Sequence, residues 1–197
     1  MAFPFPLWPT IFIFPLGLCF FYFILAGERS FERSPSDEFG AGLGQFSFLV
    51  TGTLGTISLG LRAEVPVRNA ICSAVLMFCS LALYEWARHT VRGRRFHIAW
   101  SGDVPGELCD AGPYRYVRHP VYASYFLAFA AMLVALPYLV TFAIFIFNLA
   151  LFTHAAWDDE RSLAASDLCA DYARYKKQTG MFLPRLARRA ADDTDAN

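Results

Sequence analysis

The stretch that decides the fold is GPYRYVRHPVY at residues 112–122, because a long uncharged run begins where it ends. From Pro120 to Trp157 there are 38 residues without one Asp, Glu, Lys or Arg. As a single helix that run would reach roughly 57 Å, at about 1.5 Å per residue, whereas the hydrocarbon core of a bilayer is about 30 Å thick. The run must therefore turn back on itself.

The only strong helix breaker near the middle of the run is Pro137. It divides the run into two legs, each close to the length of a single membrane crossing. Both polar ends of this helical hairpin then emerge at the same membrane face. Arg118 and His119 at one end, and Asp159 and Glu160 at the other, are therefore candidates for one shared site.

Composition places the whole chain in a membrane, since 56% of its residues are hydrophobic and the mean hydropathy is +0.36. We predict an all-α integral membrane protein, with one domain over residues 1–187 and a flexible tail over 188–197. The first apolar stretch is expected to be retained, because no Lys or Arg precedes it and no cleavage site follows it. Five membrane-spanning helices are predicted, at about 7–26, 43–61, 70–87, 120–136 and 138–156.

Basic residues predict the orientation, because cytoplasmic loops are enriched in Lys and Arg. If the face that carries residues 112–122 is cytoplasmic, 15 of the 17 basic residues lie inside, and only Arg62 and Arg68 lie outside. The C-terminus is then cytoplasmic and the N-terminus lies on the opposite side. The expected partner is the lipid bilayer. Nucleic acid is not expected, since the net charge is zero and no basic patch is interleaved with aromatic residues.

The two ends of the hairpin differ in charge. Pro120 suits the first turn of a helix, so Arg118 and His119 lie at a helix N-terminus, where an anionic ligand group is favoured. The acidic cluster at 158–160 follows the other leg, at a helix C-terminus that disfavours negative charge. It is either a solvated helix end or a site for a cation. Together the two ends would suit a zwitterionic ligand.

Tyrosines gather near both ends of the hairpin. Tyr172 and Tyr175 lie on one face of a short amphipathic helix predicted from about 161 to 177, either as packing residues or as ligand contacts. Aromatic density at the other end suits an adenine ring or a sulfonium cation, although the membrane interface alone also selects Tyr. The tyrosines at that end are Tyr114, Tyr116, Tyr122 and Tyr125.

Three polar residues within the predicted spans have structural interpretations. Glu85 is expected to pair with Arg88 and His89, three and four positions on. His154 is expected to be a hydrogen-bonded residue of the bundle, with a catalytic base as the alternative. Asn148 is expected to join helices.

Several cofactor and metal motifs are absent from the sequence. It contains no GxGxxG after a strand, no GxxxxGK[ST], no HExxH and no GxSxG. The five cysteines include no CxxC pair, and the histidines lack metal-ligand spacing, so no metal is predicted.

The segment at 112–122, an acidic pair after a hairpin, and then Tyr172-x-x-Tyr175-Lys176 resemble the isoprenylcysteine carboxyl methyltransferase family and its phospholipid methyltransferase relatives. The resemblance covers about 110–184. It implies an integral membrane enzyme that uses S-adenosylmethionine without a Rossmann domain. In such enzymes the cofactor is enclosed between the RHPxY region and the acidic segment, which agrees with the zwitterionic ligand inferred from charge.

The resemblance also assigns roles by position. Arg118 and Glu160 become catalytic candidates, and the predicted cofactor-binding residues are Tyr114, Arg118, His119, Pro120, Tyr122, Glu160 and Tyr172. The sequence departs from the family in four places. Asp159-Glu160 replaces the usual Glu-Glu, and one extra residue separates this pair from Tyr172. Ser124 replaces a common Gly, and Gln178 stands where prenylcysteine enzymes of eukaryotes have an Arg.

The predicted reaction is an in-line displacement at the sulfonium methyl group, with the acceptor entering sideways from the lipid. The acceptor is lipophilic and bears a carboxylate, amine, hydroxyl or thiol. Arg118, with Lys177 second, would position an anionic acceptor, whereas Glu160 or His154 would serve as base for a neutral one. Two alternatives remain open: an NADPH enzyme resembling sterol reductases, and a non-catalytic membrane protein on the same scaffold.

Overall fold

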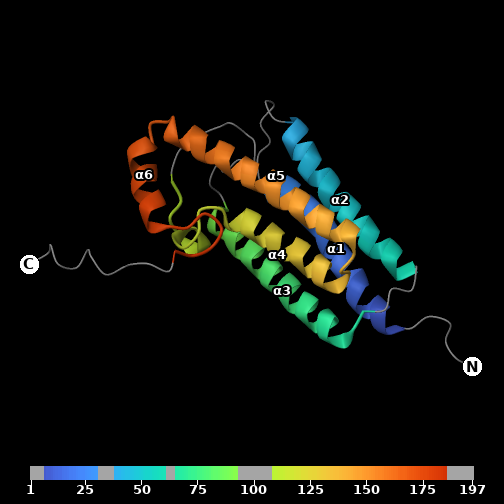
Figure 1. The fold of residues 1–197 in the computed structure, drawn as a ribbon. Coiled ribbons are helices and arrows are strands. Elements are labelled where there is room, and N and C mark those ends of the chain that lie inside the picture. Colours follow the sequence, from blue (N-terminus) through green and yellow to red (C-terminus); the bar gives the residue numbers. More distant parts are fainter. Residues whose placement is uncertain (1–6, 31–37, 61–64, 93–107, 186–197) are drawn as a thin grey trace, which may run out of the picture.

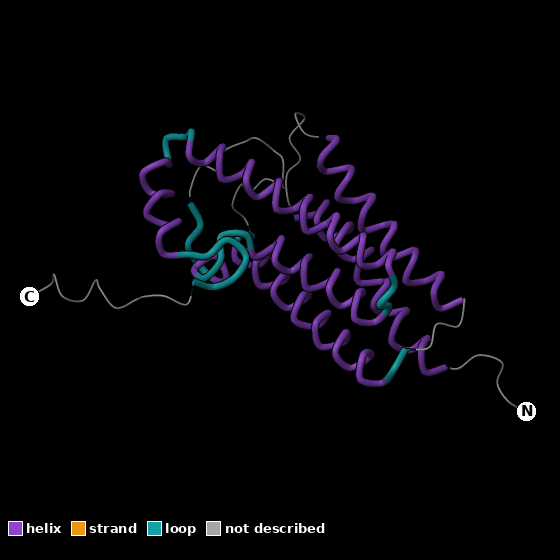
Figure 2. The backbone as a smooth tube through the Cα atoms, viewed as in Figure 1, coloured by secondary structure: helices purple, strands orange, loops and turns teal. Residues whose placement is uncertain are grey.

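The computed structural model describes residues 7–30, 38–60, 65–92 and 108–185, and within these ranges every regular element is a helix (Figures 1 and 2). The predicted all-α class is thereby confirmed. The predicted tail at 188–197 lies outside the described residues. In chain order the helices are α1 (Leu7–Ser30), α2 (Glu38–Gly60), α3 (Val67–Thr90), the short 3₁₀ helix η2 (Gly112–Arg115), α4 (Pro120–Ala135), α5 (Leu139–Ala164) and α6 (Cys169–Gln178).

The long helices alternate in direction along one bundle (Figure 1). The closest packing joins α3 to α4 and α1 to α2. One end of the bundle carries the turn between α4 and α5, and the other carries η2 and α6, shown at the left of Figure 1. Residues 112–122 therefore lie at the same end as the last turns of α5.

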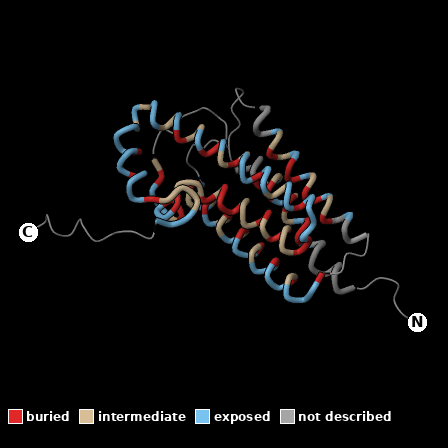
Figure 3. The backbone as a smooth tube through the Cα atoms, viewed as in Figure 1, coloured by how far each residue is buried: buried red, intermediate tan, exposed pale blue. Residues whose placement is uncertain are grey.

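Two of the described helices, α3 and α5, are long and apolar enough to cross a membrane, and α4 is a shorter apolar helix of 16 residues. Large apolar side chains point outward from both long helices, with Phe78 on α3 73% exposed and Leu139 on α5 84% exposed. Figure 3 shows the exposed positions recurring along their outer sides. Such faces suit contact with lipid. The number of crossings, five, stays a prediction.

The hairpin breaks at Pro137, as the sequence predicts. Leu136 caps the end of α4 with φ −127° and ψ 80°. This conformation lies outside the α region, and a following proline disfavours the α region for the residue before it. The turn is closed locally, since the Tyr138 N–H donates to Leu136 O at 2.8 Å and to Thr141 Oγ1 at 3.1 Å. The chain thus reverses within three residues, and α4 and α5 run antiparallel.

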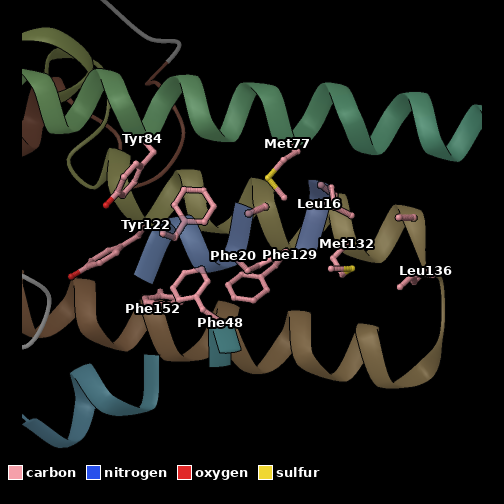
Figure 4. Packing of buried hydrophobic residues seen from close by; sticks show 14 of the residues in the cluster. Leu16, Phe20, Phe48, Met77, Tyr84, Tyr122, Phe129, Met132, Leu136 and Phe152 are labelled. Atoms are coloured by element: carbon pink, nitrogen blue, oxygen red, sulfur yellow. The ribbon is translucent and has the colours of Figure 1, made fainter. Parts of the chain in front are cut away.

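Aromatic rings fill the centre of the bundle next to the η2 end (Figure 4). Phe48 of α2 stacks on Phe129 of α4 with ring centroids 5.2 Å apart, and Phe152 of α5 lies 5.9 Å from Phe48. Phe20 and Phe23 bring α1 into the same cluster. Each such pair contributes about 0.5–1.5 kcal/mol beyond the burial of its surface. The cluster holds four helices together beneath the end that carries residues 112–122.

Buried polar side chains also join helices. Ser47 of α2 donates to Asn148 Oδ1 of α5, and Asn148 is fully buried, which agrees with the joining role predicted for it. Ser80 of α3 donates to the Ser124 carbonyl of α4 at 2.6 Å. Ser124 is itself fully buried, so only a small residue fits where α3 and α4 approach.

The prediction of one amphipathic helix over 161–177 is wrong. Helix α5 continues to Ala164, so the acidic cluster at 158–160 lies inside its last turns rather than after them, and α6 begins only at Cys169. The extension has a local cause, because Arg161 pairs with Asp158 at 3.2 Å one turn earlier and Arg161 suits the negative end of the helix dipole.

Candidate functional site

The segment that enters α4 is held by a tight turn and by α6. Gly112 has φ +56°, and a Cβ atom there would come within 2.3 Å of Thr90 Oγ1, so the turn requires glycine. Tyr114 is buried, and the Tyr175 hydroxyl of α6 donates to its carbonyl at 2.6 Å. Pro120 then occupies the first position of α4 and is fully buried.

A second contact comes from residues 179–182, which we call the C-terminal strap. The strap runs parallel to residues 116–119: the Arg118 N–H donates to Gly180 O at 2.8 Å, and the His119 N–H donates to Met181 O at 3.1 Å. Gly180 is required, because a Cβ atom there would lie 1.8 Å from Leu183 O. The strap thereby fixes the backbone from which Arg118 and His119 project.

Arg118, Glu160 and Lys176 form what we call the ionic corner, where α4, α5 and α6 meet. Arg118 Nε donates to Glu160 Oε1 at 2.8 Å, and Lys176 Nζ donates to Glu160 Oε2 at 2.6 Å. Only 9% of the Arg118 side chain and 7% of the Glu160 side chain are exposed. Arg118 Nη1 also donates to Thr179 O at 2.6 Å. The structure therefore brings together the two ends of the hairpin, as the sequence predicts.

His119 and Tyr122 extend the ionic corner toward the aromatic cluster. Their rings stack nearly parallel, with centroids 5.4 Å apart and an angle of 9° between the planes. The Tyr122 hydroxyl donates to Asp159 Oδ2 at 2.8 Å. Nε2 of His119 lies 3.5 Å from Glu160 Oε1, but the contact does not make a hydrogen bond. Both halves of the predicted pocket thus meet around Glu160.

Two polar atoms beside Glu160 are buried without a hydrogen bond of good geometry: Nε2 of His119 and the hydroxyl of Tyr172. Burial raises the pKa of the Tyr172 hydroxyl, and the nearby Glu160 carboxylate raises it further. Tyr172 therefore keeps its proton and remains a donor at neutral pH. A buried polar atom without a partner costs about 1–3 kcal/mol, so these two atoms favour a ligand that supplies partners.

Some residues considered for the site lie elsewhere. His154 is hydrogen-bonded, as predicted, since it pairs with Asp158 four positions on at 2.9 Å, but 66% of its side chain is exposed, so it does not join helices within the bundle. Trp157, three positions after His154, is also exposed, and both lie on the outer side of α5. Glu85 pairs with Arg88 and His89, as the spacing predicts.

Sequence reasoning missed Lys176 and named Lys177 instead. The signal was available, since Lys176 follows Tyr172 by four positions and therefore shares its helical face. Lys177 is exposed on another side of α6. The role of Thr179 O could not be anticipated, because a backbone carbonyl carries no sequence signal. In the part of the chain that the structure describes, no group of three His, Cys, Asp or Glu residues is placed to hold a metal ion.

Residues 74–165 match the model of the isoprenylcysteine carboxyl methyltransferase (ICMT) family. The predicted resemblance to this family is confirmed. The ICMT match begins inside α3 and ends just after α5, so it contains Arg118, His119 and Glu160 and leaves out α6. A comparison with curated proteins finds no match.

The ICMT family is one of integral membrane methyltransferases that generally use S-adenosylmethionine, and the match supports enzyme status for this chain. The chemistry of the ionic corner fits that cofactor. Its methionine portion carries a carboxylate and an ammonium, and the corner offers two cations, each within hydrogen-bond distance of the same carboxylate.

Proposed function

We propose that this chain is an S-adenosylmethionine-dependent methyltransferase whose acceptor is a lipophilic molecule delivered by the bilayer. The observation that carries the proposal is the meeting of Arg118 and Glu160 at one end of the hairpin, with two polar atoms buried beside them that lack a well-formed hydrogen bond. A cofactor with charges of both signs supplies partners to each group there. The match to the ICMT family supports the same conclusion independently.

Each end of the cofactor has a group that would hold it. Arg118 and Lys176 suit the methionine carboxylate, with Nε2 of His119 as a further hydrogen-bond partner, and Glu160 suits the ammonium. The rings of Tyr114 and Tyr122 suit the adenine and the sulfonium. Tyr172 adds a buried donor from α6. When bound, S-adenosylmethionine supplies an electrophilic methyl group.

The residues of the chain contribute alignment and exclusion of water. Arg118 and Glu160 of the ionic corner are almost fully buried, and Tyr122 stacks between His119 and Phe152, which closes the corner against the interior of the bundle. A dry site strengthens the interactions that hold a charged ligand in place. Both Glu160 oxygens accept hydrogen bonds from cations, which favours a binding role for Glu160 over proton transfer.

The proposal also covers the orientation of the chain in the membrane and the residues that form the domain. The ionic corner faces the cytoplasm, together with the C-terminus, and the N-terminus lies on the opposite side of the membrane. This orientation is supported by the 15 basic residues that it leaves inside. Residues 1–187 form one membrane domain, in which 110–184 surround the cofactor.

Calorimetry on the purified full chain in lipid nanodiscs tests the proposal. We expect S-adenosylmethionine to bind and NADPH not to bind. Binding of NADPH alone would instead favour a reductase-like enzyme. Binding of neither at about 1 mM, which corresponds to less than about 4 kcal/mol, would favour a non-catalytic protein on this scaffold.

A further inference from the structure

The carboxylate of Glu160 is enclosed by four side chains that can donate a hydrogen bond. Arg118 Nε donates to Oε1 at 2.8 Å, and Lys176 Nζ donates to Oε2 at 2.6 Å. Nε2 of His119 lies 3.5 Å from Oε1, and the Tyr172 hydroxyl is buried close by. Only 7% of the Glu160 side chain is exposed. A carboxylate has about four lone-pair positions, so a further cation can bind Glu160 only where a present neighbour gives way.

Three of these neighbours are held in place by other parts of the chain. The Arg118 side chain is 9% exposed, and its Nη1 also donates to Thr179 O at 2.6 Å. The His119 ring stacks on Tyr122, and its backbone N–H donates to the strap. Tyr172 is 4% exposed on the inner side of α6. Each of the three would have to break further contacts or leave a buried position in order to move away from the carboxylate.

Lys176 differs from these three neighbours in its freedom to move. Its side chain is 53% exposed, and its ammonium is carried on a flexible four-carbon stem. When Nζ leaves Glu160 it reaches water directly, so its departure costs less than that of a buried group. The group that it presents to Oε2, a primary ammonium, is also the cationic group of an amino acid. Lys176 is therefore the neighbour that an incoming ammonium can replace.

The charge of Glu160 limits what can take the place of Nζ. Burial raises the pKa of this carboxyl, but contacts with His119, Lys176 and Arg118 hold the pKa below its usual range. Glu160 therefore stays ionised at neutral pH, and a buried carboxylate that loses a cationic partner is destabilised. Replacement of one ammonium by another preserves the charge beside Oε2, whereas replacement by a neutral group does not.

We propose that Lys176 Nζ occupies the ammonium position of the cofactor site in the free protein, and that Glu160 Oε2 exchanges Nζ for the ammonium of S-adenosylmethionine on binding. The released Lys176 then pairs with the methionine carboxylate. The exchange rests on the proposed methyltransferase function and makes Lys176 a specificity-determining residue for an intact amino-acid end. A ligand that has the ammonium but no carboxylate displaces Lys176 without giving it a new partner.

Two ligands test the exchange: S-adenosylmethionine, and decarboxylated S-adenosylmethionine, which keeps the ammonium and lacks the carboxylate. Both affinities are measured by calorimetry on the full chain in lipid nanodiscs. We expect Lys176→Gln to weaken binding of S-adenosylmethionine about tenfold, because the carboxylate loses a charged partner. The same variant should bind the decarboxylated ligand about two- to fivefold more tightly than the wild type, because no lysine competes for Glu160 Oε2.

Two further variants control for charge. Lys177→Gln removes a positive charge one position on, at an exposed side chain, and should change neither affinity by more than twofold. Lys176→Arg keeps a competing cation, so it should not tighten binding of the decarboxylated ligand. Weaker binding of both ligands by Lys176→Gln, no change in either, or equal tightening by Lys177→Gln would overturn the exchange. Failure of the wild type to bind S-adenosylmethionine would instead overturn the proposed function.

Discussion

Two Arg–Glu pairs in this molecule use the same chemistry in different settings. Arg118 and Glu160 lie 42 residues apart, join α4 to α5, and are 9% and 7% exposed. Arg88 and Glu85 lie one turn apart on α3, and are 28% and 30% exposed. The first pair depends on the hairpin, whereas the second forms wherever that helix forms.

The difference in burial indicates which pair has a role beyond folding. A local pair on a helix contributes about 0.3–0.5 kcal/mol and is screened by solvent, so it is explained by helix formation. Burial removes the hydration of both charges, and the attraction between them barely offsets that loss. A buried ion pair is therefore weak evidence for a purely stabilising role. The desolvated Arg118–Glu160 pair, with Lys176 beside it, is therefore better explained by a ligand, and the Arg88–Glu85 pair needs none.

Glu160→Gln should have the largest effect on stability. It leaves the Arg118 charge buried without its partner, so we expect a loss of about 3–5 kcal/mol in the free energy of unfolding. The measurement is unfolding by SDS titration, followed by circular dichroism. A loss of unfolding free energy no greater than that of Glu85→Gln would contradict the distinction between the two pairs.

Gly180→Ala tests whether the strap positions the Arg118 pair. A Cβ atom would overlap Leu183 O, which is backbone and cannot rotate away, so the strap must shift. We expect a loss of about 1–3 kcal/mol, together with weaker cofactor binding, because Arg118 and His119 lose their backbone partners. Thermal unfolding and calorimetry report the two effects. Gly42→Ala is the control, since nothing lies within 4 Å of a Cβ atom there; a similar loss in that variant would argue against a role for the strap.

Lys176→Gln separates binding from stability within the ionic corner. Lys176 is 53% exposed at its side chain, so its ion pair should contribute less than about 1 kcal/mol to folding. Affinity for S-adenosylmethionine should nevertheless fall about tenfold, through loss of a charge-assisted hydrogen bond to the carboxylate. Lys177→Gln, one position on, should change neither quantity. Equal effects of the two variants on calorimetric affinity would count against the site.

Glu85→Gln should have the smallest effect. Its partners Arg88 and His89 remain partly solvated, so the expected change in the free energy of unfolding is below about 1 kcal/mol. The same SDS titration used for Glu160→Gln measures it. A loss as large as several kcal/mol would show that the α3 pair is also structural across helices, through Tyr22 of α1, which donates to Glu85.

The sequence was sufficient to predict the hairpin and the residues that meet at its end. The uncharged run is too long for one crossing and has Pro137 at its middle, so it predicts a hairpin. The contact of Arg118 with Glu160 follows from that hairpin. The Glu85 pair and the joining role of Asn148 follow from local spacing and from the cost of a polar group among apolar ones.

What the sequence could not predict depends on packing between distant segments. No feature of the amino-acid sequence shows that residues 179–182 lie against 116–119, since backbone hydrogen bonds do not depend on the identity of a side chain. The sequence-based prediction ends this helix too early, whereas α5 continues to Ala164. The acidic residues at 158–160 mark the end of the membrane span but not the end of the helix. A helix that leaves the membrane can continue in water, and Arg161 helps it to do so.

The most direct test of the central claim compares affinity for S-adenosylmethionine among the wild type, Glu160→Gln and Glu85→Gln, by calorimetry on the full chain in lipid nanodiscs. The account predicts a loss of about a hundredfold for Glu160→Gln, as expected for a charge-assisted hydrogen bond, and a change within twofold for Glu85→Gln. Equal affinities of the wild type and Glu160→Gln, or no binding by the wild type, would contradict it.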